Sequence, residues 1–101
     1  MDMVVTISSY VAKDGEEDAI IALHDGWERT QRPQAQGYIS GELFRNCKNT
    51  HAFIAILRFE NWESAQAYRL DREQDGWYQR LVNLTEEVPQ DIDYMIEWQS
   101  H

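Results

Sequence analysis

The sequence predicts an α+β domain in which a four-stranded antiparallel sheet carries two helices on one face. Three observations support this class. The 101 residues supply one domain's worth of chain, which we place at residues 1–101. Extended and helical patterns follow one another in the order β-α-β-β-α-β, which most simply gives the ferredoxin-like arrangement. The extended runs are rich in β-branched residues, and the helical runs repeat apolar residues every three or four positions.

Residues 3–11, MVVTISSYV, predict the first strand because they are almost uncharged and rich in β-branched side chains. Successive side chains of a strand point to opposite faces, so the run presents two distinct sides. One side carries Met3, Val5 and Ile7, and the other carries Val4, Thr6 and Tyr10.

The first helix is predicted from Asp14 to about residue 32. Asp14 is followed three residues later by Glu17, which matches a capping box at a helix start. Pro33 and Gly37 then end the helix. Its apolar stripe consists of Ala19, Ile20, Leu23 and Trp27.

Two extended runs, at residues 37–47 and 50–60, predict a β-hairpin because a short polar turn at Lys48 and Asn49 joins them. The second run is apolar on both sides, whereas a strand with one face in water normally alternates. Its two apolar sets are Phe53, Ala55, Leu57 and Phe59, and Ala52, Ile54 and Ile56.

A second helix is predicted to begin at Trp62 with Asn61 as its N-cap. A break is expected near Gly76, because glycine costs about 1 kcal/mol relative to alanine inside a helix. The apolar positions before and after this break are Ala65, Tyr68, Trp77, Leu81 and Leu84. After Pro89, the last strand is predicted from the alternation of Ile92, Tyr94, Ile96 and Trp98 with Asp93, Met95, Glu97 and Gln99.

With both helices on one face, the other face of the sheet is left bare. Its apolar side chains represent many kcal/mol of unburied surface at roughly 25 cal/mol per Å², and they would also favour aggregation. We therefore expect a homodimer whose sheets pack against each other. A ligand, a long tail or another protein are the alternative covers.

The composition excludes several classes of protein. Eighteen acidic and nine basic residues give a formal charge of -9, which repels nucleic acid and anionic lipid, so neither is expected as a partner. No apolar run approaches the roughly 18 residues of a membrane span. The single cysteine, Cys47, cannot form an internal disulfide, which favours a cytoplasmic location. No nucleotide-binding glycine motif occurs.

The chain resembles the antibiotic-biosynthesis-monooxygenase domain family over roughly residues 4–98. The most specific part is the run 59–67, FENWESAQA, which is similar to the family's strand-to-helix signature of an aromatic, an acid, any residue and Trp, followed by Ser and small residues. Residues 11–16, VAKDGE, and the Gly37–Tyr38 pair add to it. The resemblance implies a dimeric α/β barrel, and in some members oxygenation of phenolic or anthrone-type substrates without metal or flavin.

Two family positions differ in this chain. Many members carry a His about nine residues after the signature Trp, where this chain has Asp71. Haem-degrading members use an Asn in the first strand and a His in the second helix. This chain has Ser8 and Ser9 in the strand and no His in residues 65–84. The resemblance therefore disfavours haem degradation and leaves oxygenation, quinol chemistry or no activity open.

Twelve per cent aromatic residues, including four Trp, need a core, a pocket or a partner surface to cover them, and we expect some of the rings to line a pocket between helices and sheet. Oxygenation there would need a proton acceptor, a donor for the resulting oxyanion and a cavity that excludes water. The candidate catalytic residues are His24 as base, with Trp62 and Tyr68 as pocket wall and hydrogen-bond donor. The candidate substrate-binding residues are Ser9, Trp27, Arg58, Trp77 and Tyr78.

The helical candidates also have purely structural interpretations. Trp27 shares its stripe with core residues, Trp62 could close the end of the sheet, and His24 could face solvent. His24 and Glu28 form the one His–carboxylate pair at i, i+4 in a predicted helix. Two ligands are too few for a metal site, so no metal is expected.

The charged strand residues have a simple alternative role. Arg45 and Arg58 lie in otherwise apolar strands, where a charge needs a partner or solvent. An ion pair with Glu42 or Glu60 at a sheet edge would meet that need. His51, at the hairpin, is interpreted as a surface group.

Together these patterns predict a homodimeric, cofactor-free monooxygenase for a small aromatic, phenolic or quinol-type substrate. The alternative is a non-catalytic small-molecule-binding or stress-associated protein of the same fold. A cavity of about 300 Å³ or more, lined by Trp62 and a polar group, would favour the ligand site. Rings packed solidly against the sheet would favour a structural role.

Overall fold

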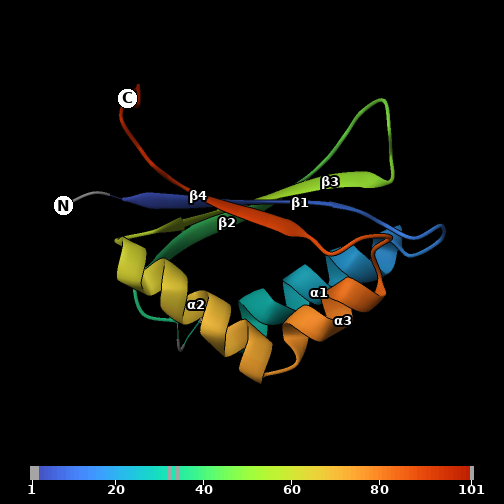
Figure 1. Cartoon of the computed structure of the whole chain (residues 1–101), viewed down its shortest axis with the longest axis horizontal. Helices are drawn as coiled ribbons and strands as arrows, with labels where there is room; N and C mark the ends of the chain where they lie inside the picture. The colour runs from blue at the N-terminus through green and yellow to red at the C-terminus, as the bar shows by residue number, and fades with distance from the viewer. Residues whose placement is uncertain (1–2, 32, 34, 101) are drawn as a thin grey trace.

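Three helices pack on one face of a four-stranded antiparallel sheet in the computed structural model, which describes residues 3–31, 33 and 35–100 (Figure 1). The strand order is β2-β3-β1-β4. This architecture confirms the predicted ferredoxin-like class, with the second helix divided in two. The elements are β1 (Val4–Val11), α1 (Glu17–Thr30), β2 (Tyr38–Arg45), β3 (Ala52–Phe59), α2 (Trp62–Gln74), α3 (Trp77–Asn83) and β4 (Gln90–Met95).

The register of the central strands separates a helix-facing side from an outer side. β1 pairs with β3 from Val4 opposite Phe59 to Val11 opposite Ala52, and with β4 from Val4 opposite Met95. Every second residue of β1 from Val4 to Tyr10 is buried beneath the helices. The buried apolar core consists of Val4, Tyr10, Ala12, Ile20, Trp27, Phe53, Ala55, Leu57, Phe59, Ala65, Tyr68, Trp77 and Leu81.

The first helix does not begin as predicted. Glu16 is the N-cap of α1 and makes no side-chain capping bond, so the predicted capping box is wrong. Gly15 has a φ of 84°, and the Glu16 N–H donates to the Lys13 carbonyl at 3.0 Å, so backbone closes the turn before the helix. The side chains of Asp14 and Glu17 are therefore not used as a reciprocal cap.

The start of α2 and the boundary with α3 follow the predictions. The Asn61 side chain accepts a hydrogen bond from the Ser64 N–H at 2.8 Å, which caps α2. Gly76 has a φ of 83°, a left-handed conformation that glycine adopts without steric cost, and it separates α2 from α3. The break therefore turns the chain so that Trp77 and Leu81 enter the core.

Two arginines of α2 are ion-paired with two aspartates of the edge strand β4. Arg69 bonds both carboxylate oxygens of Asp93, at 2.8 and 2.5 Å. Arg72, only 3% exposed, pairs with Asp91. Thr6 of β1 donates to Asp93 at 2.7 Å. Because buried charges are stable only when paired, these contacts fix α2 against β4.

The outer face of the sheet is apolar, and none of the helices in the described residues covers it (Figure 1). Its large exposed side chains come from three strands, with exposed fractions of 44 to 51% at Phe44, Ile54, Ile92 and Tyr94. The predicted bare apolar face is therefore present in the isolated chain. No helix in the part of the chain that the structure describes is long and apolar enough to cross a membrane.

Candidate functional site

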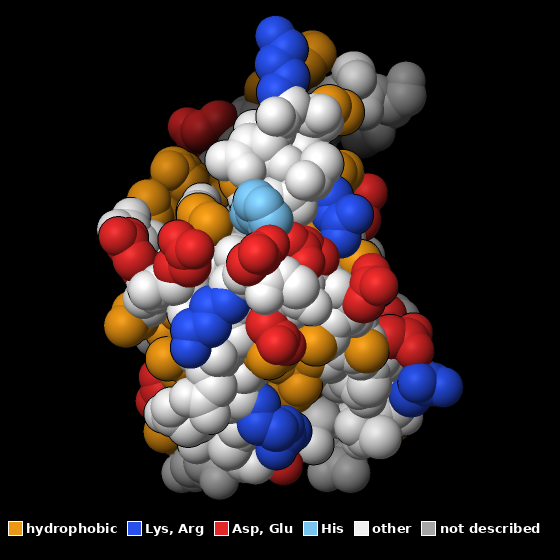
Figure 2. Space-filling model, turned by 90° about the vertical axis from the view of Figure 1, so that its right-hand side faces the viewer, with side chains coloured by type: hydrophobic (Ala, Val, Ile, Leu, Met, Phe, Trp, Pro, Cys, Tyr) orange, Lys and Arg blue, Asp and Glu red, His pale blue; other side chains and the backbone are white. Residues whose placement is uncertain are grey.

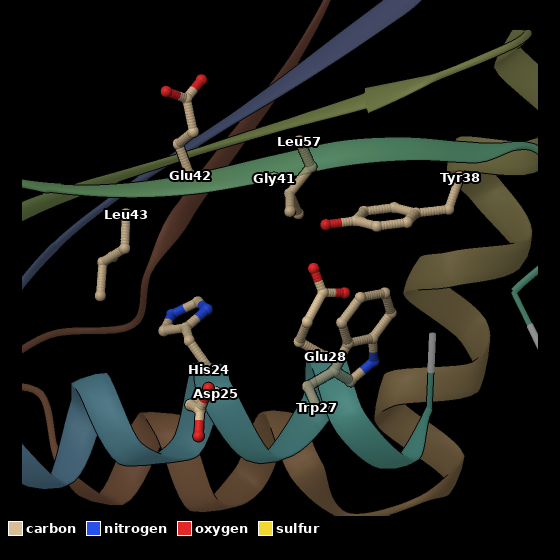
Figure 3. Close-up of a pocket in the computed structure, with 9 residues that line it drawn as sticks. All are labelled: His24, Asp25, Trp27, Glu28, Tyr38, Gly41, Glu42, Leu43 and Leu57. Carbon is tan, nitrogen blue, oxygen red and sulfur yellow. The ribbon is translucent and has the colours of Figure 1, made fainter. Parts of the chain in front are cut away.

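A cavity of about 200 Å³ opens between α1 and β2, at the edge of the sheet opposite β4. Figure 3 shows His24, Trp27 and Glu28 of α1 rising toward the strand, while Glu42 points to the other side of the sheet. The residues around the opening are His24, Asp25, Trp27, Glu28, Tyr38, Gly41, Glu42, Leu43 and Leu57.

The cavity exists because of helix spacing and one glycine. His24, Trp27 and Glu28 are three and four residues apart, which places them on one face of α1. On the strand, a Cβ added to Gly41 would lie 2.3 Å from the Tyr38 hydroxyl oxygen. Glycine at this position therefore lets the Tyr38 ring lie flat along β2. That ring meets Trp27 edge-on at 5.0 Å between centroids.

His24 is held by two aromatic neighbours. Its Nε2 is hydrogen-bonded to the Tyr10 hydroxyl, and the two rings are parallel with centroids 6.0 Å apart. Trp77 meets the imidazole edge-on at 5.2 Å, and its indole N–H donates to the Leu23 carbonyl at 3.1 Å. The imidazole is thus fixed in orientation by a buried tyrosine and a buried tryptophan.

The environment keeps this pair uncharged. Burial, together with the weaker effect of the positive charge of Arg72, lowers the pKa of His24 to about 4. Burial likewise raises the pKa of the Tyr10 hydroxyl. At neutral pH the pair has two arrangements. In one, Tyr10 donates to Nε2 and Nδ1 carries the proton. In the other, Nε2 donates to the hydroxyl oxygen and Nδ1 can accept a proton.

Of the predicted site residues, His24 and Trp27 are brought together at the cavity. Tyr68 and Trp77 are 5% and 3% exposed and are part of the buried core. Tyr78 packs against the Arg72 guanidinium, whose carbon lies 4.3 Å from the ring centroid.

The other predicted residues lie elsewhere. Trp62, at the start of α2, is 55% exposed and does not line the α1–β2 cavity, whose aromatic wall is formed by Trp27 and Tyr38. Ser9 lies on the outer side of the sheet, because its neighbours along β1 are the ones that face the helices. Arg58 is on the same outer side.

Arg58 and Arg45 have different partners. Arg58 pairs with Glu42 at 2.9 Å, which confirms the ion-pair alternative for this residue. Arg45 instead lies over the Phe53 ring at 5.1 Å. Ser9 and Arg58 are therefore not part of the helix-side cavity of one chain, because the strand register turns them away from it.

Sequence reasoning missed Tyr10, Tyr38 and Arg72 as parts of this site. A signal for Arg72 was present, since it lies four residues after Tyr68 on the same stripe of α2. The pairing of Tyr10 with His24 links a strand to a helix, and the spacing of residues within either element does not reveal it.

No family model and no curated protein matches the chain. Solved structures share its fold. A Bordetella bronchiseptica protein with the provisional name antibiotic biosynthesis monooxygenase has a TM-score of 0.82 at 17% identity, covering 97% of this chain and 100% of that one. A Nitrosomonas europaea protein with the same provisional name has a TM-score of 0.83 at 14% identity, covering 98% and 94%. SnoaB, a cofactor-independent oxygenase from Streptomyces nogalater, has a TM-score of 0.78 at 11% identity, covering 98% and 97%.

The lowered pKa of His24 predicts a specific acid sensitivity. An unfolded histidine binds a proton near pH 6.5 but folded His24 does so near pH 4, so folding loses stability as pH falls between these values. The difference in proton binding at His24 should lower the free energy of unfolding by about 2 kcal/mol as the pH falls from 7 to 5. NMR titration of the imidazole, with urea unfolding of wild type and His24→Gln at both pH values, measures it. A titration midpoint near 6.5 would contradict the buried environment.

Proposed function

We propose that the protein is a cofactor-independent monooxygenase that oxidises a small phenolic or quinol-type aromatic in the α1–β2 cavity. The observation that carries this proposal is the neutral His24 imidazole, backed by the Tyr10 hydroxyl and set in the wall of a cavity that also has aromatic walls. The shared fold with SnoaB is consistent with it.

The chemistry balances without an external electron donor. Loss of the phenolic proton makes the ring electron-rich, and the ring then transfers electrons to dioxygen. A carbon–oxygen bond forms, the oxygen–oxygen bond and one ring carbon–hydrogen bond break, and the second oxygen atom leaves as water with the phenolic and the ring protons. A phenol and dioxygen thus give a quinone and water, and the substrate supplies all four electrons.

His24 has the acid–base role in this scheme. With Nε2 donating to Tyr10, Nδ1 accepts the phenolic proton, and the resulting imidazolium stabilises the phenolate beside it. A base with a pKa of about 4 holds that proton only while the anion is present. It therefore returns the proton readily to the oxygen that leaves as water.

The cavity size selects the substrate class. An apolar cavity of about 150 Å³ binds benzene, so about 200 Å³ accommodates one substituted ring. Trp27 and Tyr38 supply the edge-on aromatic surfaces for such a ring. We therefore expect single-ring phenols and quinols as substrates, and tricyclic anthrones to be excluded.

Binding without turnover is the second candidate function. It is favoured by a cavity smaller than the roughly 300 Å³ of typical ligand sites and by a histidine already engaged by Tyr10. Ring binding without oxygen consumption would identify this function.

The assay is oxygen consumption by the purified chain with single-ring phenols and quinols. His24→Gln keeps a hydrogen-bonding group beside Tyr10 but removes the base, so kcat should fall about a hundredfold with KM nearly unchanged. Leu43→Trp should abolish binding by filling the cavity. His101→Gln, the same replacement at the last residue, is the control. Equal turnover by wild type and His24→Gln would refute the assignment.

We also propose that two copies pack through their outer sheet faces, because Phe44, Ile54, Ile92 and Tyr94 expose apolar surface there. Light scattering should give twice the 11.9 kDa chain mass. Ile54→Lys should shift the mass to that of the monomer. Leu70→Lys, at an exposed leucine of α2, should leave it unchanged. A monomeric wild type would rule out this assembly.

A further inference from the structure

Three side chains with metal-binding atoms meet at the end of the molecule opposite the start of β1. Asp14 belongs to the turn before α1, Glu17 is the first residue of α1, and His51 precedes β3. One ligand atom from each residue lies within 4.8 Å of the other two. Figure 2 shows acidic side chains gathered around a histidine on this end of the molecule.

Backbone hydrogen bonds hold the two loops together. The Ala12 N–H donates to the His51 carbonyl at 2.7 Å, and the Lys13 N–H donates to the Leu84 carbonyl at 2.9 Å. These bonds tie the turn before α1 to the hairpin and to the end of α3. The three side chains are therefore brought together by the fold, so a bound ion would not have to order the loops.

His51 contributes a ring nitrogen that already contacts an acidic side chain. Nδ1 is shielded from water and lies against the Glu17 carboxylate. The side chain as a whole is 44% exposed, so an ion can reach it from solvent. A cation beside Nδ1 would accept an electron pair from this nitrogen and one from the Glu17 carboxylate.

The charge balance at this place favours a cation. Asp14 and Glu17 bring two negative charges, and the pKa of Glu17 is lowered by a hydrogen bond to its own backbone, by its contact with His51 and by the charge of Arg45. The single positive charge of Arg45 does not neutralise two carboxylates when His51 is neutral. The cluster is then negative, in a chain of formal charge -9. An imidazole nitrogen suits zinc, iron, nickel or copper, and carboxylates complete the set.

We propose that Asp14, Glu17 and His51 form a surface binding site for a divalent transition-metal cation, with zinc as its representative, and that water fills the remaining positions. The site is separate from the α1–β2 cavity and does not depend on the proposed oxygenase function. Its other interpretation is a simple ion pair between protonated His51 and Glu17, which would bind no metal.

The test is calorimetric titration of the untagged chain with Zn²⁺, and with Mg²⁺ for comparison. The Cys47→Ser variant serves as the background, because an exposed thiol is itself a zinc ligand. We expect one Zn²⁺ per chain, bound at least about tenfold more tightly than Mg²⁺, because magnesium prefers oxygen ligands. On addition of zinc, the ¹⁵N signal of His51 Nδ1 should move and that of His24 should not.

The variants separate the site from non-specific binding. His51→Gln and Asp14→Asn should each weaken zinc binding about tenfold or more, while His101→Gln and Glu63→Gln should change it less than about twofold. Asp14 is exposed, so Asp14→Asn tests the site even if the histidine variant is unstable. Absence of saturable zinc binding, or equal binding by the Asp14 and Glu63 variants, would overturn the proposal.

Discussion

The buried ion pairs between α2 and β4 are the constraint on which the helix layer depends. Arg72 is almost completely buried, and only a partner of opposite charge makes that tolerable. Asp91 is that partner, and Arg69 with Asp93 repeats the arrangement one turn earlier. Together they place α2 over β4 and β1. A cavity lies at the opposite edge, where α1 passes over β2.

The Arg72–Asp91 ion pair also affects the acid–base chemistry of His24. Arg72 is close enough to His24 for its charge to lower the imidazole pKa, in addition to the effect of burial. A residue that anchors a helix thus helps keep the proposed base neutral. Tyr10 links the proposed base to the sheet. Its hydroxyl is hydrogen-bonded to His24, and it lies in β1, between β3 and β4. Packing and reactivity are therefore coupled through one guanidinium group.

Local patterns predicted the strands, the Asn61 cap and the break at Gly76, because each depends on neighbours within a few residues. They also singled out His24 and Trp27, which line the α1–β2 cavity. They failed where distant segments meet, as at the Arg72–Asp91 pair. The spacing of Asp14 and Glu17 fits a capping box, but in the fold their carboxylates lie beside His51, which is more than thirty positions further along the chain. Sequence spacing cannot distinguish these two uses of the same pair.

A double-mutant cycle on Arg72 and Asp91 tests the central claim most directly. If the pair anchors α2, Asp91→Leu alone should cost about 3 to 5 kcal/mol in urea unfolding, because it leaves Arg72 buried without its partner. The double variant Arg72→Met with Asp91→Leu should recover much of this loss, giving a coupling energy of about 2 kcal/mol or more. Additive losses from the two positions would contradict the account, since each side chain would then act independently of the other.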